Sequence, residues 1–226
     1  MNLEDRLKEV HDEYLRRMTQ GNGTLLQTVE QHLTASVGKM LRPRMLLSAA
    51  ATRGEEQLHS RRTLLLAVCV EMIHNASLLH DDVVDHAATR RGRPSVNAQW
   101  NNEVAVLVGD YLLSQVMQLL DEIGDKDISR KVNQTVMSMV EAELLQQELQ
   151  NTPCTLSDYL KIIDGKTANL FALAAELGNP FYRDYGLHYG RLFQLRDDIA
   201  DGEDTPWTQE LLHQEETLLD SLPALQ

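Results

Sequence analysis

The chain has 226 residues, which is long enough for one sizeable hydrophobic core and only marginally long enough for two domains. Hydrophobic residues make up 42% and charged residues 24%, a composition that is ordinary for a soluble globular protein and argues against disorder. The net charge of −13 disfavours loose binding to nucleic acid or to an anionic membrane surface. An anionic substrate must therefore meet local cations or a metal ion.

The sequence predicts a cytoplasmic protein with no transmembrane segment and no disulfide bond. Residues 1–6 are charged rather than apolar, and the longest apolar stretch, Leu64–Val70, is stopped by Glu71. That stretch is far shorter than the roughly 20 apolar residues of a spanning helix. The two cysteines, Cys69 and Cys154, have no CxxC spacing, so we expect free thiols in a reducing compartment.

Hydrophobic periodicity predicts helix along nearly the whole chain. An apolar stripe at helical spacing begins at Leu3, and a second, longer one runs from Leu64 to Val83. The best strand candidate, Val104–Val108, merges into further apolar positions as far as Leu119, which favours a buried helix. Glycine, proline and threonine predict breaks at 21–23, 38, 54, 91–94, 124, 152–153, 178–180 and 202–206.

These breaks separate about eight predicted helices. We expect the last helix to begin at Thr205 and Pro206, with the threonine as N-cap and the proline in the first turn. The sequence contains no internal repeat, low-complexity segment or Gly/Ser-rich linker. A single all-α domain over residues 1–226, built as one helical bundle, is the economical architecture.

Two carboxylate clusters with the same spacing carry the candidate chemistry. Residues 80–85 read HDDVVD, and residues 194–201 read QLRDDIAD. We call Asp81–Asp85 the first claw and Asp197–Asp201 the second claw. Positions four apart share a helix face, so the outer aspartates of each claw are expected to point the same way. The candidate metal ligands are Asp81, Asp82, Asp85, Asp197, Asp198 and Asp201.

Clustered carboxylates repel one another, which makes sense if cations bind to them. Magnesium prefers one or two carboxylates, several waters and substrate phosphates over a closed protein cage. Two claws that face each other would hold a diphosphate through bridging Mg²⁺ ions. A single cluster of this kind is as well explained by a solvated acidic helix end, but its repetition after two apolar runs favours the metal site.

Two basic segments supply further positive charge for a diphosphate. Residues 38–43 read GKMLRP, and residues 89–94 read TRRGRP directly after the first claw. Lys39 and Arg42 are three apart and are expected to share a helical face at its start. Arginine's planar fork suits phosphate oxygens, and lysine adds a mobile point charge. Without the aspartates, the second segment would read as an exposed basic turn that neutralises nearby acid.

Taken together, these motifs resemble the trans-type polyprenyl diphosphate synthases. The resemblance runs through residues 38–43, 71–74, 78–85, 90–92, 108–110, 165–168 and 193–198 in family order. It implies an all-α isoprenoid-synthase bundle with a central cavity, a homodimer and a magnesium-dependent prenyltransferase. The implied reaction is head-to-tail condensation of isopentenyl diphosphate with an allylic prenyl diphosphate, with release of pyrophosphate.

The resemblance also implies a role for each matching residue. Asp81 and Asp85, supported by Asp82, resemble the main magnesium ligands of the first claw, and Asp197 resembles the chief ligand of the second. The residues that resemble substrate contacts are Arg90 for the allylic diphosphate, and Lys39, Arg42, His74 and Arg91 for isopentenyl diphosphate. The residues that resemble the catalytic group are Lys166, which steadies the leaving group, and Thr167 and Gln194, which aim oxygen dipoles at the carbocation.

Some of these residues have simpler explanations when taken alone. His74 on an apolar helix is typical of a hydrogen-bonded core histidine, and only its place before Asp81 favours a binding role. Lys166 and Thr167 would ordinarily mark a helix interruption after Gly165. In the family, small residues above the first claw permit a medium or long product, and these positions are Ala76 and Ser77 here.

The sequence departs from the family pattern in two places. Val37 and Met40 replace a paired glycine and basic residue around Lys39, and family members continue well beyond the second claw. We therefore expect part of the usual C-terminal cavity wall to be missing. This leaves open a non-catalytic or regulatory subunit that pairs with a full-length synthase. A class I terpene cyclase is a further alternative, but Asp197, Asp198 and Asp201 do not match its second metal motif.

Overall fold

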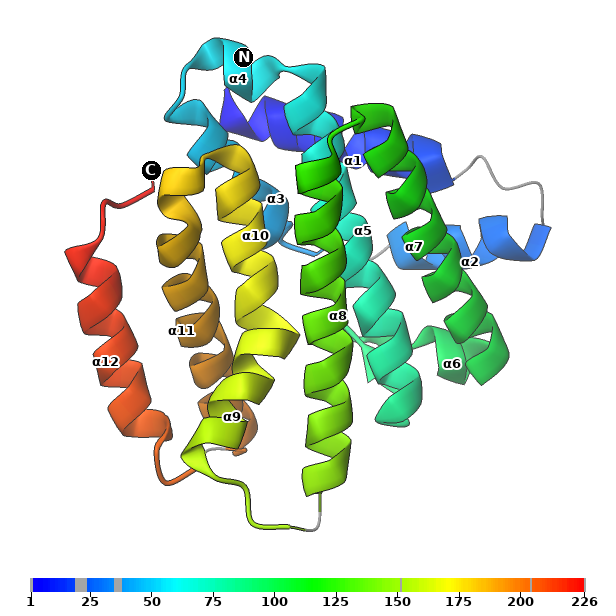
Figure 1. The fold of residues 1–226 in the computed structure, drawn as a ribbon. Coiled ribbons are helices and arrows are strands. Elements are labelled where there is room, and N and C mark those ends of the chain that lie inside the picture. Colours follow the sequence, from blue (N-terminus) through cyan, green and yellow to red (C-terminus); the bar gives the residue numbers. More distant parts are fainter. Residues whose placement is uncertain (1, 19–23, 35–37, 151, 204, 226) are drawn as a thin grey trace. The chain divides into compact units, whose positions relative to one another are not determined.

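The computed structural model describes residues 2–18, 24–34, 38–150, 152–203 and 205–225. Within these ranges the chain is almost entirely helical, and the predicted all-α fold is confirmed (Figure 1). The exception is a short antiparallel hairpin, in which β1 (Thr89–Arg90) pairs with β2 (Arg93–Pro94). The sequence predicted only a break there, because strands of two residues carry no periodicity.

The chain forms two compact units, which we describe separately. The first unit comprises Met1–Arg44 and His59–Asp125, and the second comprises Met45–Leu58 and Lys126–Gln226. The first claw lies in the first unit and the second claw in the second unit. The prediction of a single domain over the whole chain stays a prediction.

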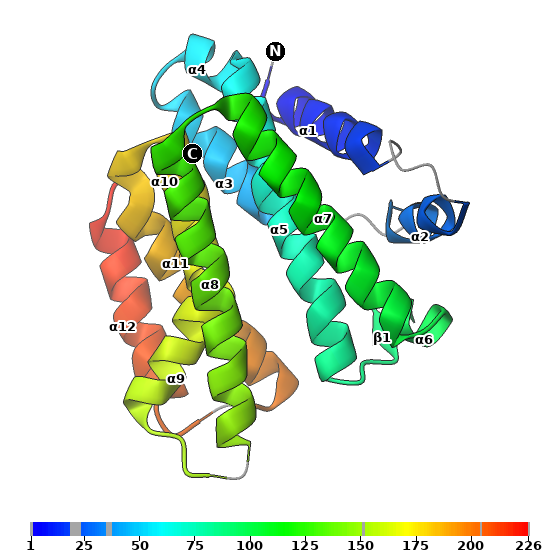
Figure 2. The same ribbon diagram turned by 45° about the vertical axis from the view of Figure 1, so that its right-hand side comes forward.

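The first unit is built around one long apolar helix, α5. Its helices are α1 (Leu3–Met18), α2 (Thr24–Thr34), α5 (Arg61–Val84), α6 (Val96–Gln99) and α7 (Asn102–Ile123), together with the start of α3 (Leu41–Ala51). The N-cap of α5 is Ser60, whose side chain accepts a hydrogen bond from the Thr63 amide. Helix α7 packs along α5, as Figure 2 shows, and its Val104–Val108 segment is helical as predicted.

Helices α5 and α7 are long and apolar enough, by length and composition, to meet a simple test for membrane spans. Core helices of soluble proteins meet the same test, and 72% of the apolar 18-residue stretch of α5 is buried inside the protein. For the corresponding stretch of α7 the buried share is 44%. This finding is weak evidence for a membrane span.

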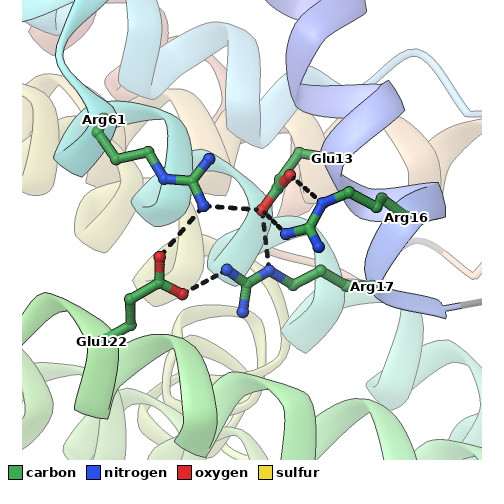
Figure 3. A network of polar contacts seen from close by, with 5 residues as sticks. All are labelled: Glu13, Arg16, Arg17, Arg61 and Glu122. Carbon is green, nitrogen blue, oxygen red and sulfur yellow. Dashed lines mark hydrogen bonds and ion pairs between the residues drawn. The ribbon is translucent and has the colours of Figure 1, made fainter. Parts of the chain in front are cut away.

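A buried carboxylate, Glu13, ties α1 to the rest of the first unit (Figure 3). Arg16 donates to it from Nε and Nη2 at 2.7 and 2.6 Å, and Arg17 donates from Nε at 3.0 Å. Arg61 at the start of α5 bridges Glu13 and Glu122 at 3.3 and 3.1 Å, and Arg17 also pairs with Glu122. The arginines, Arg16 first, lower the pKa of Glu13 from 4.5 to about 2.

The second unit is a set of helices packed around α10 and α11. Its helices are α8 (Lys126–Leu149), α9 (Leu156–Ile163), the π-helix η1 (Asp164–Ala168), α10 (Asn169–Gly178), the 3₁₀ turn η2 (Pro180–Tyr182), α11 (Arg183–Asp201) and α12 (Thr208–Ser221), and α4 (Glu55–His59) spans the boundary. Gly186 and Gly190 let α11 approach α10 closely, because a Cβ atom at either position would lie within 2.6 Å of α10 or η1 backbone. This close contact positions the second claw, at the end of α11, beside η1.

Several predicted boundaries are confirmed and others are wrong. Gly124 and Gly202 end helices with positive φ angles of 69° and 73°, and Gly54, with a φ of 103°, lies between α3 and α4, as expected of glycine breaks. The estimate of about eight helices was too low, since twelve α-helices lie in the described ranges. The predicted break at residues 21–23 lies outside the described residues.

The predicted start of the last helix is also wrong. Helix α12 begins at Thr208, three residues after the predicted N-cap. The Thr205 amide donates to the Thr208 hydroxyl oxygen at 2.8 Å, so the two threonines close a turn ahead of the helix. The threonine and proline signal marked this turn rather than the first turn of the helix.

We expect Glu13→Gln to lower the free energy of unfolding by about 2–3 kcal/mol at pH 7, because the substitution removes the charge on which three arginines converge. The pKa of Glu13 is depressed in the folded protein, so this stabilisation is complete above pH 4.5 and declines as the pH falls toward about 2. Urea unfolding at pH 7 and pH 3 measures the difference. Glu9→Gln is the control, since Glu9 is 41% exposed and pairs only with Arg6 among the ion pairs described. Equal effects of the two variants would contradict the prediction.

Candidate functional site

The first claw forms the last turn of α5 and its C-cap. Asp81 is half-buried and Asp85 is exposed, whereas Asp82 is 3% exposed. The Asp85 amide donates to the Asp81 carbonyl at 2.8 Å, which keeps the two residues in helical register. The predicted shared face of the outer aspartates is therefore compatible with the backbone, and the middle aspartate turns inward.

The buried carboxylate of Asp82 pairs with the first arginine of the hairpin. Arg90 donates to Asp82 Oδ1 from Nε at 2.9 Å and also from Nη2. The side chain of Asp82 is 4% exposed and that of Arg90 is 40% exposed. Asp82 therefore holds the hairpin against the end of α5, and it is more buried than the outer aspartates.

The hairpin turn places Arg91 against the loop that contains Gly38. Arg91 and Gly92 have φ angles of +52° and +74°, as a two-residue type I′ turn requires at both central positions. A Cβ atom on Gly38 would lie 2.4 Å from Arg91 Nη2. The two basic segments predicted from the sequence thus meet through a glycine that has no room for a side chain.

Three of the four predicted isopentenyl diphosphate contacts, Arg42, Arg91 and His74, interact electrostatically. Burial, followed by the charges of Arg42, Arg91 and Arg90, lowers the pKa of His74 well below its usual value. The imidazole is therefore neutral at physiological pH. Burial raises the pKa of the nearby carboxyl of Glu71, and the charges of Arg42 and Arg91 oppose that shift.

The fourth predicted contact, Lys39, does not lie on a helix, contrary to the prediction. Helix α3 begins at Leu41, so Lys39 precedes it and is exposed, while Arg42 is 8% exposed within its first turn. Met40 between them has a φ of +49°, which breaks helical geometry. The expectation that Lys39 and Arg42 share a helical face is therefore wrong.

A cavity of about 70 Å³ lies beside the hairpin in the first unit. It is lined by residues of α1, α2, α5 and the hairpin, among them Tyr14, Glu71, Asn75, Arg90 and Arg91. Burial and the charge of Glu71 raise the pKa of the Tyr14 hydroxyl, so this group stays a neutral donor. The cationic segments thus border this cavity.

The second claw repeats the division seen in the first. It forms the last turn of α11, which Gly202 ends in the left-handed conformation. Asp197 and Asp201 are exposed, whereas Asp198 is 8% exposed. In both claws the middle aspartate turns into the unit and is more buried than the outer aspartates.

Hydrogen bonds connect the predicted catalytic residues of the second unit. The Thr167 hydroxyl donates to Gln194 Oε1 at 2.5 Å, and Gln194 Nε2 donates to Asp198 Oδ1 at 2.7 Å. The Tyr159 hydroxyl donates to Asp198 Oδ2 at 2.5 Å. The structure therefore brings together Thr167 and Gln194, which lie 27 residues apart in the sequence.

Tyr159 is a site residue that the sequence reasoning missed. Burial and the Asp198 carboxylate raise the pKa of its hydroxyl, so Tyr159 is a neutral donor at physiological pH. The one sequence signal is its place seven residues, or about two helical turns, before Lys166. That signal is weak because aromatic residues at helical spacing are usually core residues.

Lys166 lies on a π-helix rather than at a helix interruption. The segment η1 joins α9 to α10 without a break, and π-helical turns are frequent at functional sites. Lys166 Nζ lies 2.8 Å from Glu143 Oε2 and donates to Gln146 Oε1 at 2.8 Å. With Gln194 and Asp198 it lines a cavity of about 340 Å³ in the second unit.

The donor chemistry of both claws fits magnesium that arrives with a phosphate ligand. Each claw offers two outer carboxylates in the last turn of its helix or at its cap. Among the residues that the structure describes, no three His, Cys, Asp or Glu side chains gather into a closed metal cage. Magnesium retains several waters and phosphate oxygens, so one or two carboxylates are enough to bind it.

The sequence model of the polyprenyl synthetase family matches residues 23–210. The chain therefore belongs to the polyprenyl synthetase family. This membership confirms the resemblance found in the motifs and favours it over the class I terpene cyclase alternative.

Individual relatives agree with this family. The chain is 40% identical over 201 residues to the all-trans-nonaprenyl-diphosphate synthase (geranyl-diphosphate specific) of Rhodobacter capsulatus, an alignment that covers 84% of this chain and 61% of that protein. It is 35% identical to the heptaprenyl diphosphate synthase component 2 of Geobacillus stearothermophilus, with 88% and 64% of the two chains covered. The chain thus spans about three fifths of the length of these relatives.

A solved structure supports the same fold. The polyprenyl synthase of Caulobacter crescentus CB15, complexed with calcium and isoprenyl diphosphate, matches with a TM-score of 0.83 and 34% identity. The match covers 89% of this chain and 64% of that protein. The predicted isoprenoid-synthase fold is confirmed.

The two kinds of aspartate in the first claw are expected to respond differently to substitution. Asp82→Ala should lower the free energy of unfolding by about 1–2 kcal/mol, because it removes a buried, charge-assisted hydrogen bond to a partly exposed arginine. Asp85→Ala should change it by less than about 0.5 kcal/mol, since Asp85 is exposed. Urea unfolding of both variants measures the difference, and a larger loss for Asp85→Ala would refute this division of roles.

Proposed function

We propose that the protein is a magnesium-dependent prenyltransferase that condenses isopentenyl diphosphate with an allylic prenyl diphosphate. Family membership and the names of the relatives support this reaction class. The observation that carries the proposal is that two claws, in separate units, share one arrangement of outward and buried aspartates. A metal-diphosphate substrate accounts for that repetition, whereas a solvated acidic helix end does not.

In this proposal the outer aspartates supply the metal ligands. Asp81 and Asp85 of the first claw, and Asp197 and Asp201 of the second, hold Mg²⁺ through carboxylate oxygens. Bound magnesium neutralises the allylic diphosphate and acts as a Lewis acid on the departing pyrophosphate. Arg90, anchored by Asp82, presents the exposed part of its guanidinium to the same diphosphate.

Isopentenyl diphosphate binds at the cationic group of the first unit. Arg42 and Arg91 contribute positive charge, and neutral His74 donates a hydrogen bond without adding a charge. Lys39, exposed ahead of α3, adds a mobile ammonium group that is free to follow the diphosphate.

The second unit acts on the carbocation that forms when the allylic C–O bond breaks. The Thr167 hydroxyl oxygen and the Gln194 amide are linked at 2.5 Å and supply fixed dipoles for the developing positive charge. Lys166 steadies the leaving diphosphate, which requires it to exchange its ion pair with Glu143 for the substrate. Preorganised dipoles lower the barrier because they need no reorientation as the charge appears.

We propose a medium or long polyprenyl product. Ala76 is buried and Ser77 is half-buried one turn before the first claw, and both side chains are small. The relatives are named for nonaprenyl and heptaprenyl products. These names and the two small residues support a chain longer than that of the shortest prenyl diphosphates.

We also propose that the protein works as a homodimer. On α7, Leu107 and Met117 are 66% and 68% exposed, and on α8, Met137, Val140 and Leu144 are each at least 55% exposed. The three residues of α8 are spaced three and four apart, so their apolar side chains share one face. Such faces are typical of contacts with a partner chain.

A second candidate function is a subunit of a heteromeric synthase. The Geobacillus stearothermophilus relative is named as component 2 of a heptaprenyl diphosphate synthase. In that case the purified chain would bind an allylic diphosphate in the presence of magnesium but would not elongate it alone. Turnover by the purified chain would exclude this candidate.

The test is incubation with magnesium, labelled isopentenyl diphosphate and a panel of allylic diphosphates, following pyrophosphate release and product length. We expect an elongated product that disappears when the metal is chelated. Asp81→Ala should lower kcat by about 10²-fold or more, because it removes a ligand of the metal that stabilises the leaving group. Glu56→Gln, a charge change at an exposed site on α4 that lines neither cavity, is the control. Full activity of Asp81→Ala would contradict the proposal.

Gly38→Ala tests the predicted isopentenyl diphosphate site without a large change in folding stability. The added Cβ would lie 2.4 Å from Arg91 Nη2, and the flexible guanidinium can move aside at little cost in folding free energy. We expect KM for isopentenyl diphosphate to rise about tenfold, the effect of weakening one charge-assisted contact. KM for the allylic substrate and the urea midpoint should stay unchanged. An equal rise in both KM values would show that Arg91 is not a specific contact of isopentenyl diphosphate.

A further inference from the structure

Both carboxylate oxygens of Asp198 are occupied by protein donors. Oδ1 accepts from Gln194 Nε2 at 2.7 Å, and Oδ2 accepts from the Tyr159 hydroxyl at 2.5 Å. Asp198 is 8% exposed, whereas its neighbours in the second claw, Asp197 and Asp201, are exposed. Asp198 is therefore arranged to receive hydrogen bonds from the protein.

These bonds determine how the Gln194 amide is oriented. An amide side chain has a donor end and an acceptor end. Because the NH₂ end donates to the Asp198 carboxylate, the oxygen end faces Thr167 and accepts from its hydroxyl at 2.5 Å. A rotation of the amide by 180° would set its oxygen against the carboxylate, which repels it.

Tyr159 in turn fixes Asp198. Its side chain is buried in an apolar cluster with Ile163, Leu195 and Leu211, the last of which lies on α12. The ring is therefore held by packing, and its hydroxyl is neutral because burial and Asp198 raise its pKa. A hydrogen-bond chain runs from Tyr159 through Asp198 and Gln194 to Thr167. The bonds within such a chain polarise one another.

We infer that Tyr159 is a positioning residue that acts through Asp198 to hold the Gln194 amide and the Thr167 hydroxyl in the orientation needed for catalysis. Asp198 serves this chain and is not a ligand of the metal, in contrast to the ligand role that the sequence motif predicts for it. The inference rests on the proposed prenyltransferase function. It also assigns α12 a role, since Leu211 of this helix packs around the Tyr159 ring.

The first test is the kinetics of Tyr159→Phe, which removes only the hydroxyl. We expect kcat to fall about tenfold, less than the loss of a group in direct contact with the reacting charge. The KM values and the magnesium concentration for half-maximal rate should change by less than about twofold, because the variant leaves the binding groups in place. The matched control is Tyr189→Phe, since Tyr189 is half-buried in the same unit and packs its ring on Phe171. Wild-type kcat for Tyr159→Phe, in an otherwise active protein, would overturn the inference.

A double-mutant cycle with Thr167→Val tests whether the two hydroxyls act through one chain. If they do, the double variant should lose little more kcat than Thr167→Val alone, because each substitution disables the same arrangement. Multiplicative losses would show that the two residues act independently and would overturn the inference. A merely structural role for Tyr159 would lower stability without this coupling.

A binding measurement tests the role of Asp198 without relying on turnover. Calorimetry follows the binding of Mg²⁺ together with methylenediphosphonate to the intact chain. Asp197→Asn should weaken this binding about tenfold or more, as expected for loss of a metal ligand, while Asp198→Asn should change it by less than about threefold. Equal weakening by the two variants would make Asp198 a ligand and overturn the inference. If wild-type protein neither binds the pair nor elongates any substrate, the proposed function itself fails.

Discussion

The turn of the α-helix is the constraint on which both claws depend. Successive residues are about 100° apart around the helix, so the outer aspartates of a DDxxD motif share a face and the middle one points elsewhere. Asp82 and Asp198 therefore lie on a different face from their neighbours, and they are buried, while Asp85, Asp197 and Asp201 are exposed. A motif that reads as three equivalent ligands therefore contains two kinds of carboxylate.

Burial of the middle aspartate is stable only because each unit supplies donors for it. The first unit uses Arg90 from the hairpin, and the second uses the neutral groups Tyr159 and Gln194. The two solutions have different consequences. In the proposed reaction the buried carboxylate of the first unit positions a cation for an anionic substrate, and that of the second unit orients dipoles toward a cationic intermediate. Under this proposal the same motif serves opposite electrostatic needs.

Local charge also reconciles the net charge of −13 with the proposed binding of two diphosphates. Arg42, Arg90 and Arg91 come together in the first unit closely enough to lower the pKa of His74. The buried carboxyl of Glu71 lies near two of these arginines, and their charges oppose the rise in its pKa. Gly38 has no side chain and therefore leaves room for the Arg91 guanidinium.

The sequence by itself determined the helical class, the glycine breaks and both claws, because periodicity and backbone freedom are local properties. It misplaced Lys39, whose helix begins later than expected because Met40 has a positive φ. Only the tertiary structure decided which aspartates are buried against donors. The bond from Tyr159 to Asp198 joins residues 39 positions apart, and no local pattern marks such a pair. The choice of partner depends on how α9, α11 and α12 pack around one core, which is a property of the folded chain.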